Sequence, residues 1–345
     1  MNTITHPGLH QTSLLDLLPE HGTAAAPAVR HLGATAVSGP LDLPAPRGTD
    51  PDRPIRFVDH FAGIGGFHLA LGRLGAECVF ATERDRYART TYENNFKPRC
   101  PELFAAGRFA RDIADVDPTE VPAHDIVTAG FPCQPFSVTG RQRGLDDERG
   151  VMFYQLARLI MHTRPRAFIF ENVAGLRFHH HGTTFAAIRE TMTTQLGYSF
   201  RTAVLRACDY GLPQLRPRLF MVGFRDPSTP FAFPEPTPLA FTLSDLFGGH
   251  CDRELAHTLL ASGANKHIGR PFNWDAYLVN GREHHLSARE AATLQGFPDG
   301  FELPTVRARA LTQIGSAVAV PVATAVARQV ITALHTHDTH QESHS

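Results

Sequence analysis

Short apolar runs alternate with amphipathic stretches from Ile55 to Phe224, and this alternation is the first regularity in the sequence. The apolar runs have strand length, and the amphipathic stretches have helix length. Strands are expected at Ile55–Val58, Cys78–Ala81, Ile126–Thr128, Ala167–Phe170 and Leu219–Phe224. Helices are expected at Phe67–Leu74, Arg86–Asn95, Met152–His162 and Thr184–Leu196. Strands that alternate with helices predict a parallel sheet in an α/β fold.

The pattern changes after Phe224. Pro-rich, irregular sequence continues to about Gly281, and helical periodicity returns at Ser287–Gln295 and Ala317–Leu334. Residues 1–53 are rich in Ala, Pro, Gly and Thr and are predicted to be a disordered extension. Residues 336–345 are predicted to be a disordered tail. We therefore expect a main domain of residues 54–225 plus 303–335, and a small second domain of residues 226–302.

Composition indicates a globular protein of the cytoplasm. The chain has 345 residues, of which 42% are hydrophobic, and a formal net charge of −1. No apolar run looks long enough to cross a membrane, and no secretory signal is evident. The cysteines are isolated, which fits neither a disulfide framework nor a zinc site. His179–His181 are consecutive and are expected in a solvated loop, so no metal site is predicted.

Arginines cluster in two places, although the protein is almost neutral. Five lie between Arg201 and Arg225 against one acid, Asp209, and Arg141 and Arg143 form a second group. Local basic faces can bind phosphates. Charge alone, however, favours ordinary solvated surface.

A glycine-rich turn follows the first predicted strand, from Phe61 to Phe67, and Glu83 ends the next strand. Glycines let the backbone approach a ligand, and an acid about 20 positions later suits a ribose diol. A dinucleotide would usually need a third glycine, where this chain has His68. The pattern favours a nucleoside without a pyrophosphate, and a turn with no ligand stays an alternative.

Three chemically useful groups occupy strand ends. Cys133 lies between Pro132 and Pro135 just after a predicted strand, Glu171 ends another, and Arg216 and Arg218 precede a third. A lone cysteine is more often a small buried hydrophobe. A cysteine with an acid and arginines, but no histidine, is unsuited to peptide hydrolysis. It suits addition of a thiolate to carbon 6 of cytosine, which makes carbon 5 able to attack a methyl sulfonium.

These motifs resemble those of the bacterial DNA (cytosine-5)-methyltransferases. The resemblance covers residues 57–224 and 286–323 and is most specific at Gly130–Ser137. Further matches are Glu171-Asn172-Val173, Arg216 with Arg218 after Gln214, and Glu290–Pro298. The resemblance implies a Rossmann-like S-adenosylmethionine-dependent methyltransferase domain, followed by a small, mostly irregular or β target-recognition domain at residues 226–302.

The resemblance also implies roles for individual residues. Cys133 is the expected nucleophile, Glu171 contacts ring nitrogen 3, Arg218 contacts the cytosine carbonyl, and Arg216 orders the thiolate and a phosphate. Phe61 stacks on adenine, Glu83 holds the ribose, and Asp112 with Ile113 meets the adenine edge. The remaining cofactor assignments are Gly63, Ile64, Gly65, Pro132 and Ser316. The DNA assignments are Gln134, Ser137, Arg141, Arg143 and Arg270, and residues 137–149 resemble the family's mobile loop.

Two positions depart from the family pattern. Ser316 stands where asparagine is usual. Serine can still donate one hydrogen bond to the cofactor carboxylate, so weaker cofactor binding is expected rather than its loss. His60 stands where leucine is usual, as a packing change. In the variable segment, Lys266, His267, Arg270, Asn273 and Trp274 are candidate base contacts, although the single tryptophan is better suited to the core.

Three rival functions remain open. A tRNA cytosine methyltransferase is disfavoured because its Cys-Phe-Thr signature is absent, and a catalytically dead relative because both cysteine and acid are present. A dinucleotide-dependent oxidoreductase leaves Cys133 unexplained. The expected partner is double-stranded DNA, with the protein acting as a monomer. A restriction endonuclease acting on the same site, without a stable complex, is the expected companion.

Overall fold

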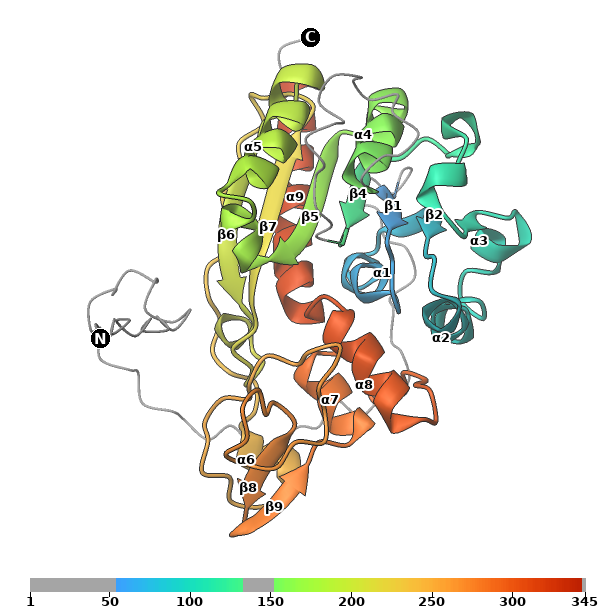
Figure 1. Ribbon diagram of the computed structural model, residues 1–345. Helices are drawn as coiled ribbons and strands as arrows, with labels where there is room; N and C mark the ends of the chain where they lie inside the picture. Colours follow the sequence, from blue (N-terminus) through green and yellow to red (C-terminus); the bar gives the residue numbers. More distant parts are fainter. Residues whose placement is uncertain (1–53, 133–151, 343–345) are drawn as a thin grey trace, which may run out of the picture. The chain divides into compact units, whose positions relative to one another are not determined.

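A seven-stranded sheet forms the centre of the computed structural model, which describes residues 54–132 and 152–342. The strand order is β3-β2-β1-β4-β5-β7-β6 (Figure 1). The strands are β1 (Arg56–His60), β2 (Glu77–Thr82), β3 (Phe109–Ala110), β4 (Ile126–Ala129), β5 (Ala167–Val173), β6 (Arg201–Arg206) and β7 (Pro217–Phe224). All five predicted strands are confirmed, whereas β3 and β6 were missed. The α/β fold class is confirmed.

The prediction of a parallel sheet was wrong for one strand. Strands β1 to β5 pair in parallel, but β7 is antiparallel to both β5 and β6. Only residues 207–216 separate β6 from β7, too few for the helical crossover that parallel neighbours require. The start of β7 therefore lies beside the end of β5, and Arg218 is in register with Val173.

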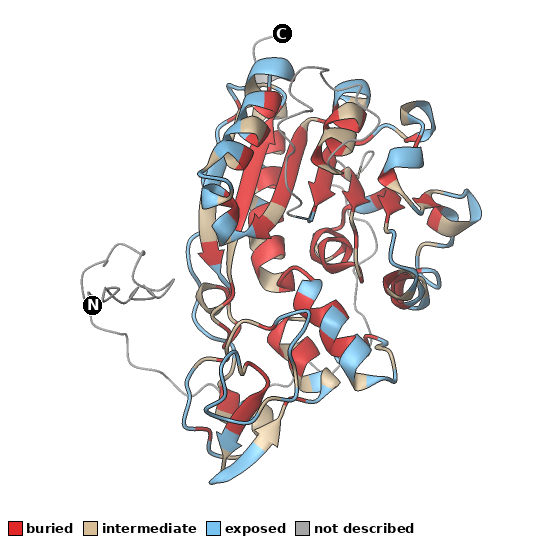
Figure 2. Ribbon diagram, in the orientation of Figure 1, coloured by how far each residue is buried: buried red, intermediate tan, exposed pale blue. Residues whose placement is uncertain are grey.

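Side chains alternate between two apolar layers, one on each face of the sheet. Phe57, Ile126 and Ile169 pack with α1 (Gly66–Gly72) and α9 (Val320–Glu342). Val58, Val127 and Phe168 pack with α4 (Met152–Thr163) and α5 (Thr183–Glu190), which continues as a π-turn to Gln195. Figure 2 shows the central strands buried between these helices. The two-sided burial explains why the strands read as continuous apolar runs.

Four further helices lie between β2 and β3 or after β7 along the chain. They are α2 (Arg86–Phe96), α3 (Pro101–Ala105), α7 (Ala288–Leu294) and α8 (Arg307–Ser316). Asp85 caps α2, and Ser287 with Glu290 forms a capping box at α7. Each cap satisfies backbone N–H groups that a helix start leaves unpaired. Helices α3 and α8 were not predicted.

Residues 226–281 are mostly irregular, as predicted, but they contain α6 (Leu243–Phe247) and the first strand of a hairpin. Strands β8 (Ala276–Val279) and β9 (Arg282–His285) pair antiparallel across Asn280 and Gly281, which both have positive φ. An Asn-Gly pair favours such a hairpin turn, so the hairpin was predictable. The boundaries of a separate domain at 226–302 stay a prediction.

The C-terminal helix corrects two expectations. Helix α9 continues to Glu342, so the predicted disorder was wrong for residues 336–342. Asp338 forms an ion pair with Arg166, and His337 Nε2 lies 3.1 Å from Asp226 Oδ2. The stretch 307–339 is long and apolar enough to cross a membrane by length and composition, contrary to the sequence reading. Its most apolar window is 67% buried inside the protein, as in a core helix.

Candidate active site

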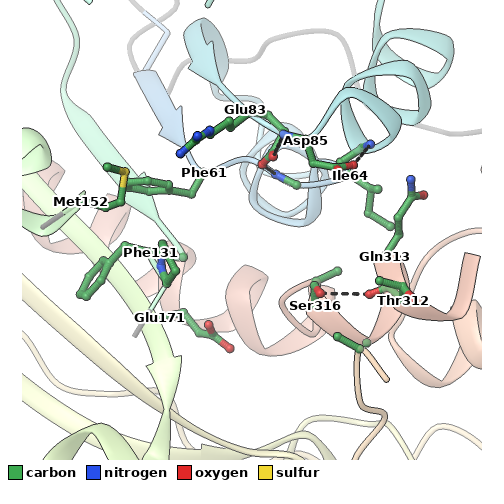
Figure 3. A pocket seen from close by; sticks show the side chains of 18 of the residues that line it. Phe61, Ile64, Glu83, Asp85, Phe131, Met152, Glu171, Thr312, Gln313 and Ser316 are labelled. Carbon is green, nitrogen blue, oxygen red and sulfur yellow. Dashed lines mark hydrogen bonds between the residues drawn. The ribbon is translucent and has the colours of Figure 1, made fainter. Parts of the chain in front are cut away.

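A cavity of about 1040 Å³ opens at the carboxyl ends of β1, β2, β4 and β5. Such an edge is where α/β proteins usually bind ligands. In Figure 3, Glu83 and Asp85 lie on one side of this cavity, Glu171 lies opposite, and Thr312 and Ser316 complete it. The cavity thus joins the glycine-rich turn to Glu171 and Arg218.

The glycine-rich turn depends on left-handed backbone at Phe61, Gly63 and Gly65. A Cβ at Gly65 would lie 2.2 Å from Cε2 of Phe96, whereas a Cβ at Gly63 would meet no atom within 4 Å. Gly65 is therefore required by packing behind the turn as well as by its φ of 91°. Phe61, Gly63 and Ile64 line the cavity whereas Gly65 does not, and their predicted contacts with a cofactor stay predictions.

Glu83 ties the turn to the end of β2. One carboxylate oxygen accepts the N–H of Gly63 at 2.8 Å, and the other accepts that of Asp85 at 2.7 Å. Burial raises the pKa of the Glu83 carboxyl above its usual range. Each oxygen retains acceptor capacity toward the cavity, as a ribose diol would need.

The other predicted cofactor residues lie around the same cavity. Asp112 accepts the N–H of Ala114, and its other oxygen lies 3.6 Å from Nε of Arg84. Ile113 and Pro132 also line the cavity. The Ser316 hydroxyl donates to the Thr312 carbonyl at 2.9 Å (Figure 3), so a hydrogen bond to a ligand would require it to exchange this partner.

Glu171 and Arg218 meet at the opposite end of the cavity. Arg218 Nε lies 3.2 Å from Glu171 Oε1, and both side chains are mostly buried. The contact is an ion pair without hydrogen-bond geometry, so buried Oε1 has no hydrogen-bond partner among the described residues. The reversed direction of β7 creates this contact, because it brings the start of β7 to the end of β5. An acceptor with no partner at a cavity wall is suited to a polar ligand.

Asn172 positions the segment that precedes Cys133 in the sequence. Its side-chain amide donates to the carbonyl of Phe131 at 2.9 Å, and its oxygen accepts the N–H of Val173. This buried bond joins the end of β5 to the segment leaving β4. Cys133 lies outside the described residues, as do Gln134, Ser137, Arg141 and Arg143, so their predicted roles stay predictions.

Arg216 is almost completely buried, at 1% exposed. Its guanidinium donates to the carbonyls of Leu259, Gly315 and Ala317 at 2.9, 2.9 and 2.6 Å. Burial lowers the pKa of the Arg216 guanidinium well below its usual value. Its φ of 25° is unusual for a non-glycine residue and is maintained by these contacts. The described contacts are structural, and the predicted role toward a thiolate and a phosphate stays a prediction.

Two buried polar residues lie beneath the turn: Asp59, which the sequence did not reveal, and His60, which was expected as a packing change. Asp59 accepts a hydrogen bond from Thr128 at 2.8 Å, while its second oxygen has no partner among the described residues. Burial raises the pKa of Asp59 to about 7. His60 pairs with the Thr82 hydroxyl at 3.1 Å, and burial lowers its pKa to about 3, so it packs as a neutral ring.

The candidate base contacts divide into two groups. Trp274 is buried and donates to the Ser262 carbonyl, and Asn273 bonds both backbone groups of Ala276, so these two are structural. His267 and Arg270 are exposed and Lys266 is partly exposed. None of the five lines the cavity.

Comparison with known proteins supports a family assignment. The family model described as C-5 cytosine-specific DNA methylase matches residues 55–259 and 250–332. The Type II methyltransferase M.HhaI of Haemophilus parahaemolyticus is 34% identical over 322 residues, covering 81% of this chain and 95% of that protein. The Type II methyltransferase M.NgoBI of Neisseria gonorrhoeae is 36% identical over 296 residues, covering 77% and 89%.

Solved structures agree on the fold. The S. pombe Dnmt2 methyltransferase superposes with a TM-score of 0.62 at 16% identity, covering 82% of this chain and 99% of that one. The Entamoeba histolytica methyltransferase EhMeth superposes with a TM-score of 0.59 at 14% identity, with the same coverage. Together with the sequence matches, these findings show that the chain belongs to the C-5 cytosine-specific DNA methylase family and is a DNA (cytosine-5-)-methyltransferase.

Proposed function

We propose that this protein flips a cytosine out of duplex DNA and methylates its carbon 5, with Cys133 as nucleophile and S-adenosylmethionine as methyl donor. The observation that carries the proposal is the shared cavity. The Glu171–Arg218 pair lines the same cavity as the glycine-rich turn and Glu83. A base and a nucleoside cofactor bound there would lie side by side.

The residues around the turn suit S-adenosylmethionine. The Glu83 carboxylate has acceptor capacity left for two ribose hydroxyls, and Phe61 offers an aromatic face for adenine. Asp112 and Ile113 would meet the adenine edge. When bound, S-adenosylmethionine supplies a methyl group on a positively charged sulfur.

The other residues act on the cytosine. The Cys133 thiolate adds to carbon 6 while Glu171 holds a proton at ring nitrogen 3, so electron density moves to carbon 5. Arg218 holds the ring carbonyl and restrains the Glu171 side chain at 3.2 Å. After methylation, carbon 5 loses its hydrogen as a proton and the thiolate leaves carbon 6, which restores the ring.

The biological setting is part of the same proposal. The relatives named Type II methyltransferases are bacterial, and we infer that this protein is the modification enzyme of a restriction–modification system. It would act as a monomer on DNA in the cytoplasm, beside a restriction endonuclease that cuts the same sequence. Bisulfite sequencing of host DNA with and without the gene would give the recognised sequence.

Duplex DNA containing 5-fluorocytosine should trap the enzyme covalently. Fluorine at carbon 5 cannot leave as a proton does, so the adduct between Cys133 and carbon 6 would persist after methylation. We expect a denaturation-resistant complex on a gel that requires S-adenosylmethionine, while unsubstituted duplex and a tRNA give none. Methylation of ordinary duplex without any trapped complex would contradict the proposed mechanism, and trapping of the tRNA would favour the rival substrate.

The substitution Glu83→Gln should weaken cofactor binding more than it slows the chemical step. An amide cannot accept hydrogen bonds on both atoms, so the ribose contact and the support of the turn are both impaired. We expect Kd for S-adenosylmethionine, measured by calorimetry, to rise roughly 10-fold or more, with a smaller change in kcat. Glu102→Gln, on the exposed face of α3 away from the cavity, is the control. Equal effects on Kd and kcat would count against the ribose assignment.

A further inference from the structure

Two histidines and a glutamate converge beside the β8–β9 hairpin. His267 Nδ1 lies 2.6 Å from Glu283 Oε1, and His285 Nε2 lies 3.0 Å from the same oxygen. One potential ligand atom from each of the three residues lies within 4.8 Å of the others. They come from two segments, because Glu283 and His285 belong to β9 and His267 to the preceding loop.

The alternation of a β-strand explains why two of these residues face the same way. Positions 283 and 285 are two apart, so their side chains project from one face of β9, whereas His284 projects from the other. His284 accordingly pairs with Glu290 and packs on Phe247. The backbone N–H of Ile268 approaches the second Glu283 oxygen at 3.3 Å, which orients the first oxygen between the histidines.

A buried carboxylate orients His285 from behind. Asp275 is 0% exposed, and its Oδ2 lies 3.4 Å from Nδ1 of His285 and 2.9 Å from Arg307. If Nδ1 donates its hydrogen to Asp275, a neutral His285 presents only a lone pair at Nε2. That lone pair then points at the Glu283 carboxylate, and two acceptors at 3.0 Å repel unless a proton or a cation lies between them. A carboxylate behind a histidine is also the usual arrangement at metal-binding histidines.

We propose that His267, Glu283 and His285 bind a divalent transition-metal ion, with Zn²⁺ as the best match to two imidazoles and one carboxylate. Ligand atoms of a tetrahedral zinc ion lie about 3.3 Å apart for bonds of about 2.0–2.1 Å. The two short contacts must therefore widen by less than an ångström, and His267, with 77% of its side chain exposed, is free to move. The fourth position stays open to water.

Such an ion would fix the loop before the hairpin. It would cross-link residue 267 to β9, and this loop carries Lys266 and Arg270, two of the candidate base contacts. The site lies outside the cavity that holds Glu83 and Glu171, so the ion has no part in the methyl transfer. Its effect would be structural.

Zinc binding to the untagged full chain, stripped with a chelator, tests the proposal. We expect one Zn²⁺ per chain in competition with a chromophoric chelator, and a tetrahedral absorption spectrum with Co²⁺. His267→Gln and Glu283→Gln should each weaken this site by more than about 100-fold, since even an outer-shell partner is typically worth roughly 10- to 100-fold. Zn²⁺ should raise Tm of the unaltered protein but not of these variants.

His181→Gln controls for unspecific binding, because the chain contains 20 histidines and His181 is exposed elsewhere. This control should bind Zn²⁺ like the unaltered protein. The proposal is overturned if the unaltered protein binds no Zn²⁺ saturably, or if the two ligand variants bind it as tightly as the control does. In either case only hydrogen bonds hold His267, Glu283 and His285 together.

Discussion

Cys133→Ser is expected to abolish methyl transfer. A serine hydroxyl is a far weaker nucleophile than a thiolate at neutral pH, so addition to carbon 6 fails and carbon 5 is never activated. We expect kcat, measured as labelled methyl incorporated into duplex DNA, to fall by at least about 10⁴-fold, or roughly 5.5 kcal/mol in the activation barrier. Binding of duplex DNA in a gel-shift assay should stay within a few-fold of normal.

Cys208→Ser provides the matched control for this loss. Cys208 is half-buried in the turn between β6 and β7 and does not line the cavity. It should therefore retain nearly full activity. Near-normal turnover by Cys133→Ser, or an equal loss in both variants, would show that the nucleophile has been assigned to the wrong residue.

Glu171→Gln should produce the second-largest loss of activity. Glu171 Oε1 is buried at the cavity wall and has no hydrogen bond within residues 54–132 and 152–342. An amide there cannot hold a transferable proton at ring nitrogen 3. Loss of such proton transfer typically costs about 10²–10⁴-fold in rate. We expect a fall of that size in kcat, with little change in Kd for S-adenosylmethionine, because Glu83 lies across the cavity (Figure 3).

The exposed Glu190, at the end of α5, supplies the control variant Glu190→Gln. Covalent trapping by 5-fluorocytosine DNA should slow in parallel with kcat for Glu171→Gln and stay unchanged for the control. A kcat within a few-fold of normal, or a loss confined to cofactor binding, would remove Glu171 from the step at the ring.

The hydrophobic pattern of the sequence predicted most strands of the sheet but not the direction in which each strand runs. Buried strands such as β4 and β5 are apolar on both faces, and this pattern is visible in the sequence. The edge strand β6 was missed because most of its side chains are exposed or only partly buried. Hydrophobicity says nothing about the direction of a strand, so the reversal of β7 could not be predicted from the sequence.

The residues at strand ends were the predictable part of the site. Glu171 ends a predicted strand and was expected at the carboxyl edge of the sheet. Arg218 stands at the start of its strand, so its meeting with Glu171 was expected from the family resemblance, and the unpredicted reversal of β7 makes it possible. The bond from Asn172 to Phe131 and the contacts of Arg216 join segments far apart in the chain, which no local pattern reveals. Likewise, the histidines at 179–181 are neighbours in the sequence and were considered as metal ligands. His267 and His285 are far apart in the sequence and become neighbours only in the folded protein.

The three carbonyls held by Arg216 restrict how this enzyme can be re-engineered. A Cβ at Gly315 would lie 2.3 Å from the Leu260 carbonyl oxygen, so the main chain at 259–261 fits directly against α8. A foreign target-recognition segment grafted into this protein should therefore begin after residue 261, so that residues 259–261 stay against α8. Arg216 and Gly315 should be exchanged together or not at all.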